Sequence, residues 1–292
     1  GEVDHEFLAG HARRMLASGC RGLVALGSLD EGATLTGAEK LAILRTCVQA
    51  VGDRIPVVAG VSALSTQEAV DLARSAAGAG CGGLMVLPPY VYRGDWPEMR
   101  AHVDAVITAT PLSCLLYNNP IAYGTDVTPD QLAELAEMHD NLHAVKESSG
   151  DVRRVTALRE RLGDRVAIFV GMDDMILESI PMGAVGWIAG LVNAFPEESV
   201  QLFELGLAGR MEEAWALYEW FLPLLRLDTV PKFVQLIKLT QAEVGHGSAT
   251  VRPPRLELDG ADLAEVQALI RERIAARPAA KAAGARRTAV AV

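Results

Sequence analysis

Short apolar segments rich in Val, Ile and Leu alternate with longer amphipathic segments along most of the chain. Buried parallel strands are continuous apolar runs, and the helices that connect them carry one apolar face, so this alternation is typical of repeated βα units. The pattern predicts seven strands, at 22–27, 56–61, 83–87, 113–118, 142–148, 166–171 and 185–190.

Amphipathic segments predict a helix before the first strand and one after each strand up to the sixth. Asp4 is a suitable N-cap for the first, and Thr128 followed by Pro129 is a strong helix start. The helices expected around the sheet are 4–18, 37–51, 66–79, 95–109, 128–138, 151–162 and 173–182. Those expected after the last strand are 196–207, 210–225, 229–244 and 261–276.

A closed parallel barrel of this kind takes eight strands, each followed by its helix. Here seven strands follow an initial helix, so we expect an α/β fold, a TIM (β/α)8 barrel that lacks its first strand in this chain. We place the barrel at 1–194, a C-terminal helical subdomain at 195–276, and a low-complexity mobile tail at 277–292.

The composition of the chain excludes or disfavours several classes of protein. Half of the 292 residues are apolar and the net charge is −10, which excludes a wholly disordered chain and disfavours a nucleic-acid partner. The four cysteines are far apart, with no metal-binding or disulfide spacing, and no stretch is long enough to span a membrane. We therefore expect a cytoplasmic protein with reduced thiols and no membrane partner.

Only five lysines are present, and Lys146 is the one placed for chemistry. Active sites of such barrels lie at the carboxyl ends of the strands, and alternation puts Leu142, Ala144 and Lys146 on one face of the fifth strand. A desolvated lysine has a pKa below its usual value of ~10.4 and can attack a carbonyl carbon to form a Schiff base. The alternative is a structural ion pair with Glu147 or another carboxylate.

Three other strand ends carry polar groups. Tyr117 ends the fourth strand, where its hydroxyl could relay protons or only fill the barrel top. Ser28 precedes a loop whose backbone amides could hold a carboxylate. Asp173 and Asp174 lack a third ligand at metal-binding spacing, so helix capping is the preferred interpretation.

Several motifs in fixed order resemble the dihydrodipicolinate synthase and N-acetylneuraminate lyase family over residues 3–258. They are Gly-Ser-x-x-Glu from residue 27, Tyr-Asn-x-Pro from 117, Lys-Glu-Ser-Ser-Gly-Asp from 146, Gly-x-Asp-Asp from 171 and Gly-x-Ile-x-Gly-x-x-Asn from 186. The resemblance implies a barrel with a C-terminal helical appendage, usually a homotetramer, that handles 2-oxo acids through a lysine imine without a metal or an organic cofactor.

The resemblance also implies residue roles. Lys146 is similar to the Schiff-base lysine, and Tyr117 to the proton-relaying tyrosine. Ser28, with the backbone amide of Leu29, resembles the clamp on the pyruvate carboxylate. Two further positions, Gly171 and Ile188, fall where the family lines the floor of the pocket.

The chain departs from the synthase pattern near the second substrate. Where the synthase has an arginine that holds the carboxylate of the aldehyde, this chain has Ala122, and Leu29 replaces a second hydroxyl. Asp30 replaces a glycine, which matters if that position needs a positive φ. The synthase often has two adjacent tyrosines after a proline, one of which reaches across a subunit interface. At that place this chain has Pro89-Tyr90-Val91-Tyr92.

These observations predict a Schiff-base lyase that acts on pyruvate or another 2-oxo acid by aldol reaction, dehydration or deamination. The first alternative is 4-hydroxy-tetrahydrodipicolinate synthase itself, with its carboxylate anchor supplied from elsewhere. The second alternative is a non-catalytic barrel that binds a 2-oxo acid.

Overall fold

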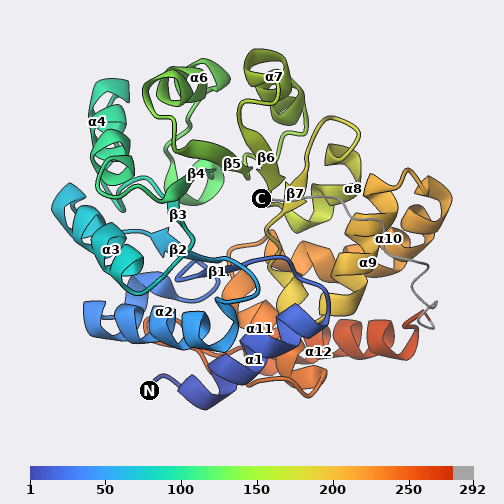
Figure 1. Cartoon of the computed structure of the whole chain (residues 1–292). Coiled ribbons are helices and arrows are strands. Elements are labelled where there is room, and N and C mark those ends of the chain that lie inside the picture. Colours follow the sequence, from blue (N-terminus) through green and yellow to red (C-terminus); the bar gives the residue numbers. More distant parts are fainter. Residues whose placement is uncertain (279–292) are drawn as a thin grey trace.

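A computed structural model describes residues 1–278 of this chain, which fold around one parallel sheet. Each strand pairs with the next in chain order, so helices cross over on the outside of a curled sheet (Figure 1). The strands are β1 (Leu23–Ala25), β2 (Val57–Val61), β3 (Gly83–Val86), β4 (Ser113–Asn118), β5 (Leu142–Glu147), β6 (Ala167–Val170) and β7 (Gly186–Trp187).

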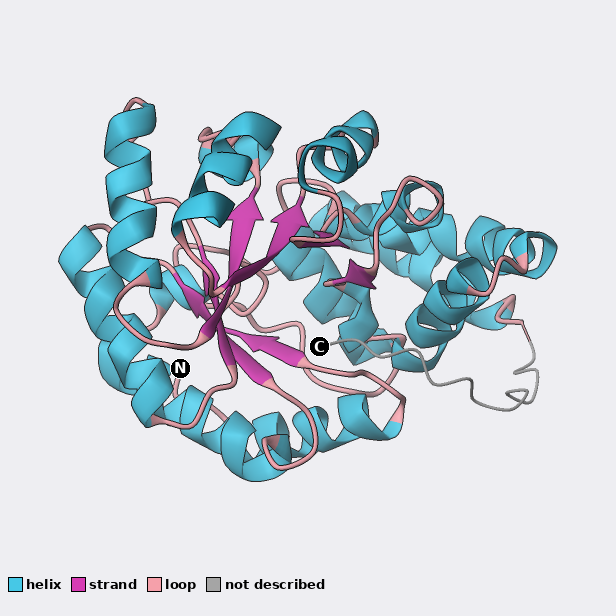
Figure 2. Cartoon of the chain, turned by 45° about the horizontal axis from the view of Figure 1, so that its top comes forward, coloured by secondary structure: helices cyan, strands magenta, loops and turns pink. Residues whose placement is uncertain are grey.

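Helices surround the sheet, as Figure 2 shows, and a further group lies beside β7 and below the barrel in Figure 1. The barrel helices are α1 (His5–Ala17), α2 (Gly37–Val51), α3 (Thr66–Gly78), α4 (Trp96–Ile107), α5 (Pro120–Tyr123), α6 (Pro129–Met138), α7 (Arg153–Leu162) and α8 (Ile176–Ser179). The C-terminal helices are α9 (Pro196–Leu207), α10 (Met211–Leu225), α11 (Phe233–Glu243) and α12 (Gly260–Ala275). Single 3-10 turns are η1 (Gly32–Thr34), η2 (Asp173–Met175), η3 (Leu191–Asn193) and η4 (Arg226–Asp228).

The predicted fold class is confirmed, including seven parallel strands that follow an initial helix. Within the described chain β1 and β7 form the two edges of the sheet and do not pair with each other. The predicted boundaries between the barrel, the helical subdomain and the tail stay predictions. Of the tail, residues 279–292 lie outside the described residues.

Local signals explain most helix starts. The Asp4 carboxylate accepts a hydrogen bond from the Phe7 amide at 2.9 Å, and the Thr128 hydroxyl accepts one from the Gln131 amide at 3.3 Å. The prediction at 173–182 is wrong in detail, because that segment divides into η2 and α8. The one at 229–244 starts too early, because α11 begins only at Phe233, after η4 and Pro231.

Two apolar layers lie on opposite faces of the sheet. Met85, Leu87, Leu115, Tyr117 and Ala144 fill the inside of the barrel. The larger outer layer lies between the strands and the helices, and runs from Ala12 in α1 to Ile270 in α12.

The predicted common face of Leu142, Ala144 and Lys146 is wrong for Leu142. Along β4 and β5, Cys114 pairs with Leu142 but Leu115 pairs with Ala144, so His143 is an extra residue. This bulge places Leu142 in the outer layer while Ala144 stays inside. Lys146 keeps its predicted position two residues beyond Ala144.

Two expectations from composition are partly met. All four cysteines are free thiols, three of them buried, and burial raises the pKa of Cys47 to about 12. Among residues 1–278, no helix is both long enough and apolar enough to cross a membrane.

Candidate active site

Lys146 lies at the centre of the candidate site, near the carboxyl end of β5. It pairs with Tyr117 on β4 and with Phe169 on β6, so neighbouring strands hold it on both sides. Its Nζ lies 4.3 Å from the centroid of the Tyr117 ring. The pairing of β4 with β5 therefore brings together two residues for which the sequence predicts different roles, the amine of Lys146 and the phenol of Tyr117.

The Lys146 amine has no hydrogen bond or ion pair with any residue in the described chain. Every other described lysine has one: Lys40 donates to the Ser62 carbonyl at 3.3 Å, Lys232 pairs with Asp262 at 2.8 Å and Lys238 with Glu31 at 2.8 Å. Lys281 lies outside the described residues. Of the five lysines, Lys146 is thus the one whose amine is shown to be available.

The alternative interpretation of Lys146, an ion pair with Glu147, is not what the structure shows. Glu147 is buried on the other side of β5, where its carboxylate accepts hydrogen bonds from Asn118 Nδ2 at 3.0 Å and the Ser149 amide at 2.6 Å. The Glu147 carboxylate therefore connects the ends of β4 and β5.

Gly171 forms the floor under the lysine side chain. A Cβ built at this residue would overlap both Lys146 Cε and Ser148 Oγ, so the lysine passes directly over a bare backbone. Ser148 Oγ is buried and has no hydrogen-bond partner in the described chain. A polar hydroxyl without a partner next to the lysine stem is free to bond a group formed on the amine.

A cluster of hydroxyl groups faces the lysine from β1 and β4. Asn119 Nδ2 donates to the Tyr117 hydroxyl at 3.0 Å, and the hydroxyls of Ser28 and Tyr123 form a short hydrogen bond. The Tyr123 ring stands edge-on to the Tyr117 ring, with the centroids 5.8 Å apart. Ser28 and Tyr117 are thus linked through Tyr123.

Sequence reasoning missed Tyr123. It ends α5, a single helical turn that Asn119 caps by accepting the Ala122 amide at 3.0 Å, with Pro120 as its first residue. Asn followed by Pro is a helix-start signal, and one turn beyond it returns the chain over the end of its strand. Burial, with the adjacent Tyr117, raises the pKa of Tyr123 well above 10, so this phenol stays protonated and can donate to Ser28.

The loop after β1 contains two backbone N–H groups that are available as hydrogen-bond donors. Within the described residues, the backbone amides of Ser28 and Leu29 make no hydrogen bond, whereas the Gly27 amide donates to Asp30 at 2.9 Å. The Asp30 position does not need a positive φ, because the left-handed residues after β1 are Leu26, with φ of 69°, and Glu31, with φ of 57°. Ser28 and Leu29 therefore present two amides and a hydroxyl where a carboxylate could bind.

The remaining predicted residue, Ile188, follows β7 and packs with the inner layer near Tyr117. Asp173 is fully buried, and it accepts hydrogen bonds from the Gly190 and Leu191 amides, at 3.1 and 2.7 Å, and from the indole of Trp187 at 3.0 Å. The capping interpretation holds, but the helix that it caps is η3. In residues 1–278 no group of three His, Cys, Asp or Glu side chains is arranged to hold a metal ion.

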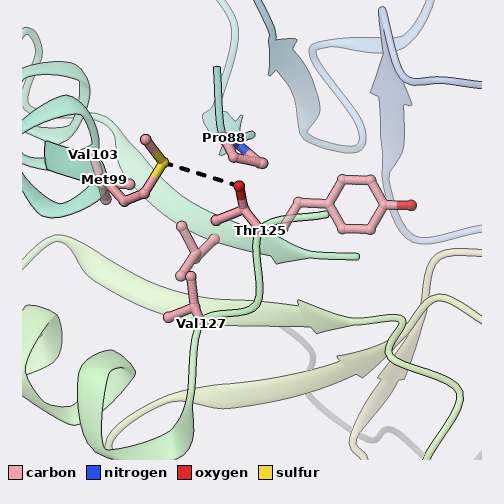
Figure 3. A pocket seen from close by; sticks show the side chains of 7 residues that line it. Pro88, Met99, Val103, Thr125 and Val127 are labelled. Atoms are coloured by element: carbon pink, nitrogen blue, oxygen red, sulfur yellow. Dashed lines mark hydrogen bonds between the residues drawn. The ribbon is translucent and has the colours of Figure 1, made fainter. Parts of the chain in front are cut away.

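A small cavity behind Tyr117 is separate from this site. Met99 and Val103 of α4 face Thr125 and Val127 across it, and Thr125 donates weakly to the Met99 sulfur at 4.0 Å (Figure 3). Its lining is almost entirely apolar and includes neither Lys146 nor Ser28. A polar 2-oxo acid therefore has no place in this cavity.

Comparisons with known proteins agree with the motifs. The model of the dihydrodipicolinate synthetase family matches residues 1–273. The 4-hydroxy-tetrahydrodipicolinate synthase of Haloarcula marismortui is 33% identical over 88% of this chain and 84% of its own length. The enzyme of the same name from Geotalea uraniireducens is 31% identical over 93% of each chain.

Solved structures agree as well. The 4-hydroxy-tetrahydrodipicolinate synthase of Methylacidiphilum fumariolicum SolV superposes with a TM-score of 0.89 at 29% identity, over 94% of this chain and 93% of that one. YagE, a prophage protein of E. coli K12 solved in complex with pyruvate, superposes with a TM-score of 0.88 at 25% identity, over 94% of each chain.

Proposed function

Because this chain belongs to the dihydrodipicolinate synthetase family and is thus a lyase, we propose that it acts on pyruvate or another 2-oxo acid through a Schiff base on Lys146. The observation that carries the proposal is the unpaired Lys146 amine over the Tyr117 ring. An amine held by a carboxylate would be kept as the ammonium ion, which cannot attack a carbonyl carbon.

In the proposed first step, the Ser28 hydroxyl and the amides of Ser28 and Leu29 bind the carboxylate of the 2-oxo acid. The Lys146 amine adds to the keto carbon, and the carbonyl oxygen becomes the hydroxyl of a carbinolamine. Tyr117 protonates this hydroxyl, which leaves as water when the C=N bond forms. Ser148 Oγ, unpartnered beside the lysine stem, supports the carbinolamine hydroxyl.

In the second step, loss of a proton from C3 of the iminium gives an enamine. Its carbon adds to the aldehyde carbon of a second substrate, and the new alkoxide takes a proton from the site. Hydrolysis of the imine then returns the amine and releases a 4-hydroxy-2-oxo acid; the reverse sequence is an aldol cleavage. Asn119 donates to the Tyr117 oxygen and so stabilises the phenolate after each proton transfer.

The second substrate is proposed to lack the carboxylate that the synthase anchors. Ala122 lies on α5 beside the site, and a methyl group cannot form the bidentate contact of an arginine. This position favours catabolic 2-keto-3-deoxy acids or related compounds as substrates, in an aldol, dehydration or deamination reaction.

The runner-up is 4-hydroxy-tetrahydrodipicolinate synthase, the name that the relatives carry. One feature favours it: the Arg93 guanidinium lies directly against Gly124, at the end of α5, where a Cβ would overlap it. An anchor could therefore come from the loop after β3. Condensation of pyruvate with aspartate semialdehyde, lost in Arg93→Ala and kept in an Arg153→Ala control, would favour this candidate.

Borohydride reduction in the presence of pyruvate, followed by peptide mass mapping, tests the proposal. We expect one stable adduct, on Lys146, that Lys146→Ala abolishes and the matched Lys40→Ala variant retains. Tyr117→Phe should slow turnover while leaving some trapping. A folded protein without an adduct on Lys146 would refute the Schiff-base mechanism; an adduct without turnover of any aldehyde would favour the non-catalytic barrel.

We also propose that the protein works as a homotetramer in the cytoplasm. Large apolar side chains are exposed in the loops after β2, β3 and β4: Leu64 at 67%, Val91 at 91% and Ile121 at 68%. Apolar groups gathered at one rim favour contact with a second copy. Light scattering should give a mass above one chain, and Val91→Asp should lower it.

A further inference from the structure

Asp228 brings a carboxylate from the C-terminal helices to the end of the barrel. It is the last residue of η4, directly after α10, and η4 packs against η2 in the loop after β6. Its carboxyl group lies against the backbone of Gly190, in the loop after β7, where a Cβ would overlap it. Two strand-end loops and the helical subdomain therefore fix its position.

The Asp228 carboxylate has no polar partner in residues 1–278, although it is only partly exposed. Its neighbours do have partners: three N–H groups donate to Asp173, and Arg226 Nε lies 3.9 Å from Asp174. A largely desolvated carboxylate without a donor is unfavourable unless the site supplies one when it is occupied.

Nearby charges change the pKa of Asp228, and one of them is the charge of Lys146, the proposed nucleophile. Burial and the nearby charge of Asp173 raise its pKa, with a smaller effect of Asp174, while the positive charge of Lys146 lowers it. The fold places the two groups at the same end of the barrel, because η4 packs against η2, and η2 begins two residues after Gly171, over which the Lys146 side chain passes. We expect the part of a substrate that extends from Lys146 beyond Gly171 to approach Asp228.

We propose that Asp228 is a specificity-determining residue that binds a hydroxyl group on the part of the substrate beyond the 2-oxo acid unit. The inference rests on the proposed function of Lys146. A carboxyl group exchanges hydrogen bonds with hydroxyl groups in either protonation state, and the negative charge that Asp228 and Asp173 share disfavours a second carboxylate. Together with Ala122, this selects neutral hydroxylated substrates over carboxylated ones.

Three 2-oxo acids of equal chain length test the inference in the full-length protein: 2-keto-3-deoxygluconate with hydroxyls, 2-oxohexanoate without them, and 2-oxoadipate with a terminal carboxylate. The readout is the concentration that half-saturates borohydride trapping on Lys146, counting the adduct of the acid and of any pyruvate cleaved from it. We expect the wild type to prefer the hydroxylated acid to both others.

Asp228→Asn should weaken trapping of the hydroxylated acid by about 2- to 10-fold, the effect of one neutral hydrogen bond, and should strengthen trapping of 2-oxoadipate. Trapping of 2-oxohexanoate and pyruvate should not change. Asp53→Asn is the control, because Asp53 is exposed just before β2, at the end of that strand opposite to the candidate site, and it should leave the order of preference intact. Asp228→Ser replaces the Asn variant if the latter fails to trap pyruvate.

The outcomes separate the two proposals. If wild-type protein does not trap pyruvate, the proposed function fails, and this inference fails with it. If pyruvate is trapped but the wild type does not prefer the hydroxylated acid, or Asp228→Asn weakens all acids equally, the role of Asp228 is refuted while the Schiff base stands.

Discussion

The Lys146 amine is available because two neighbouring residues neither cover it nor pair with it. Gly171 contributes no side chain beneath it, and Glu147 turns to the opposite face of β5. Gly171→Ala would force Cβ into Lys146 Cε, which is part of a flexible side chain, so the lysine should move and the fold should survive. We expect trapping of pyruvate to fall by more than about 10-fold, with a loss of stability of about 1–3 kcal/mol.

The matched control is Gly10→Ala. Gly10 lies in α1 with open space around it, so an added methyl should leave trapping unchanged and should raise the free energy of unfolding by about 0.5–1 kcal/mol. Rates of borohydride trapping and urea unfolding measure both effects. Normal trapping by Gly171→Ala would mean that the lysine does not work in the position seen here.

Tyr123 should affect binding more than turnover. Its phenol shares a hydrogen bond with the Ser28 hydroxyl, and when Tyr123 is the donor the Ser28 hydrogen is left for the substrate carboxylate. Tyr123→Phe removes that donor, so we expect the half-saturating pyruvate concentration to rise about 2- to 10-fold, as for one neutral hydrogen bond. Tyr117→Phe should instead lower the rate, because Tyr117 is proposed to move protons.

A comparison of Tyr123→Phe with Tyr92→Phe separates this role from a general effect of lost tyrosine hydroxyls. Tyr92 is exposed and donates to Glu98 at 2.8 Å, away from Lys146. Steady-state KM and kcat for pyruvate are the measurements. Equal effects of the two variants, or a change of rate alone in Tyr123→Phe, would contradict a binding role.

Among the elements, η3 depends on one buried carboxylate from another loop. Asp173 is fully buried and accepts three N–H groups, two of them at the start of η3. Below its pKa the protonated carboxyl group brings one hydrogen toward these donors, whereas an asparagine brings two, so Asp173→Asn should lower the free energy of unfolding by about 1–3 kcal/mol at pH 4. The exposed Asp53→Asn is the control and should change little.

The effect of Asp173→Asn should depend on pH. Burial raises the pKa of Asp173 in the folded protein above the ordinary value of 3.8, so the folded state binds its proton more tightly than the unfolded state. Its contribution to stability is therefore full below pH 3.8 and is lost as pH rises through the folded pKa. Urea unfolding from pH 4 to 7 should show the difference between wild type and variant shrinking; a difference that grows would contradict this.

Strands and capped helices could be predicted from the sequence because their signals are local. The apolar runs that end at Tyr117 and Lys146 located both residues near the ends of β4 and β5, and Thr128 with Pro129 located the start of α6. The bulge at His143 could not be predicted, because it is defined by pairing with β4. Tyr123 and Asp228 were missed for a similar reason: each is positioned by contact with a residue distant in the sequence, Tyr123 by Ser28 and Asp228 by Gly190.

At the scale of the whole molecule, the C-terminal helices pack against the barrel and stabilise it. The outer apolar layer continues from α1 to α12 without a break. Glu31, buried at the end of the loop proposed to bind the substrate carboxylate, pairs with Lys238 Nζ at 2.8 Å and accepts the Arg252 amide at 2.7 Å. One carboxylate thus joins the loop that holds Ser28 to α11 and to the chain beyond it.

We therefore expect the barrel and the C-terminal helices to unfold in a single transition. Glu31→Gln leaves Lys238 facing a neutral amide, and breaking a buried ion pair of this kind costs about 3–5 kcal/mol. Urea unfolding followed by hydrogen exchange should show β1 and α11 losing protection together, at a lower midpoint in the variant and with an unchanged m-value. If α11 exchanged before β1 in the wild type, the helices would be a separate cooperative unit, and the position of Asp228 would not be coupled to the barrel.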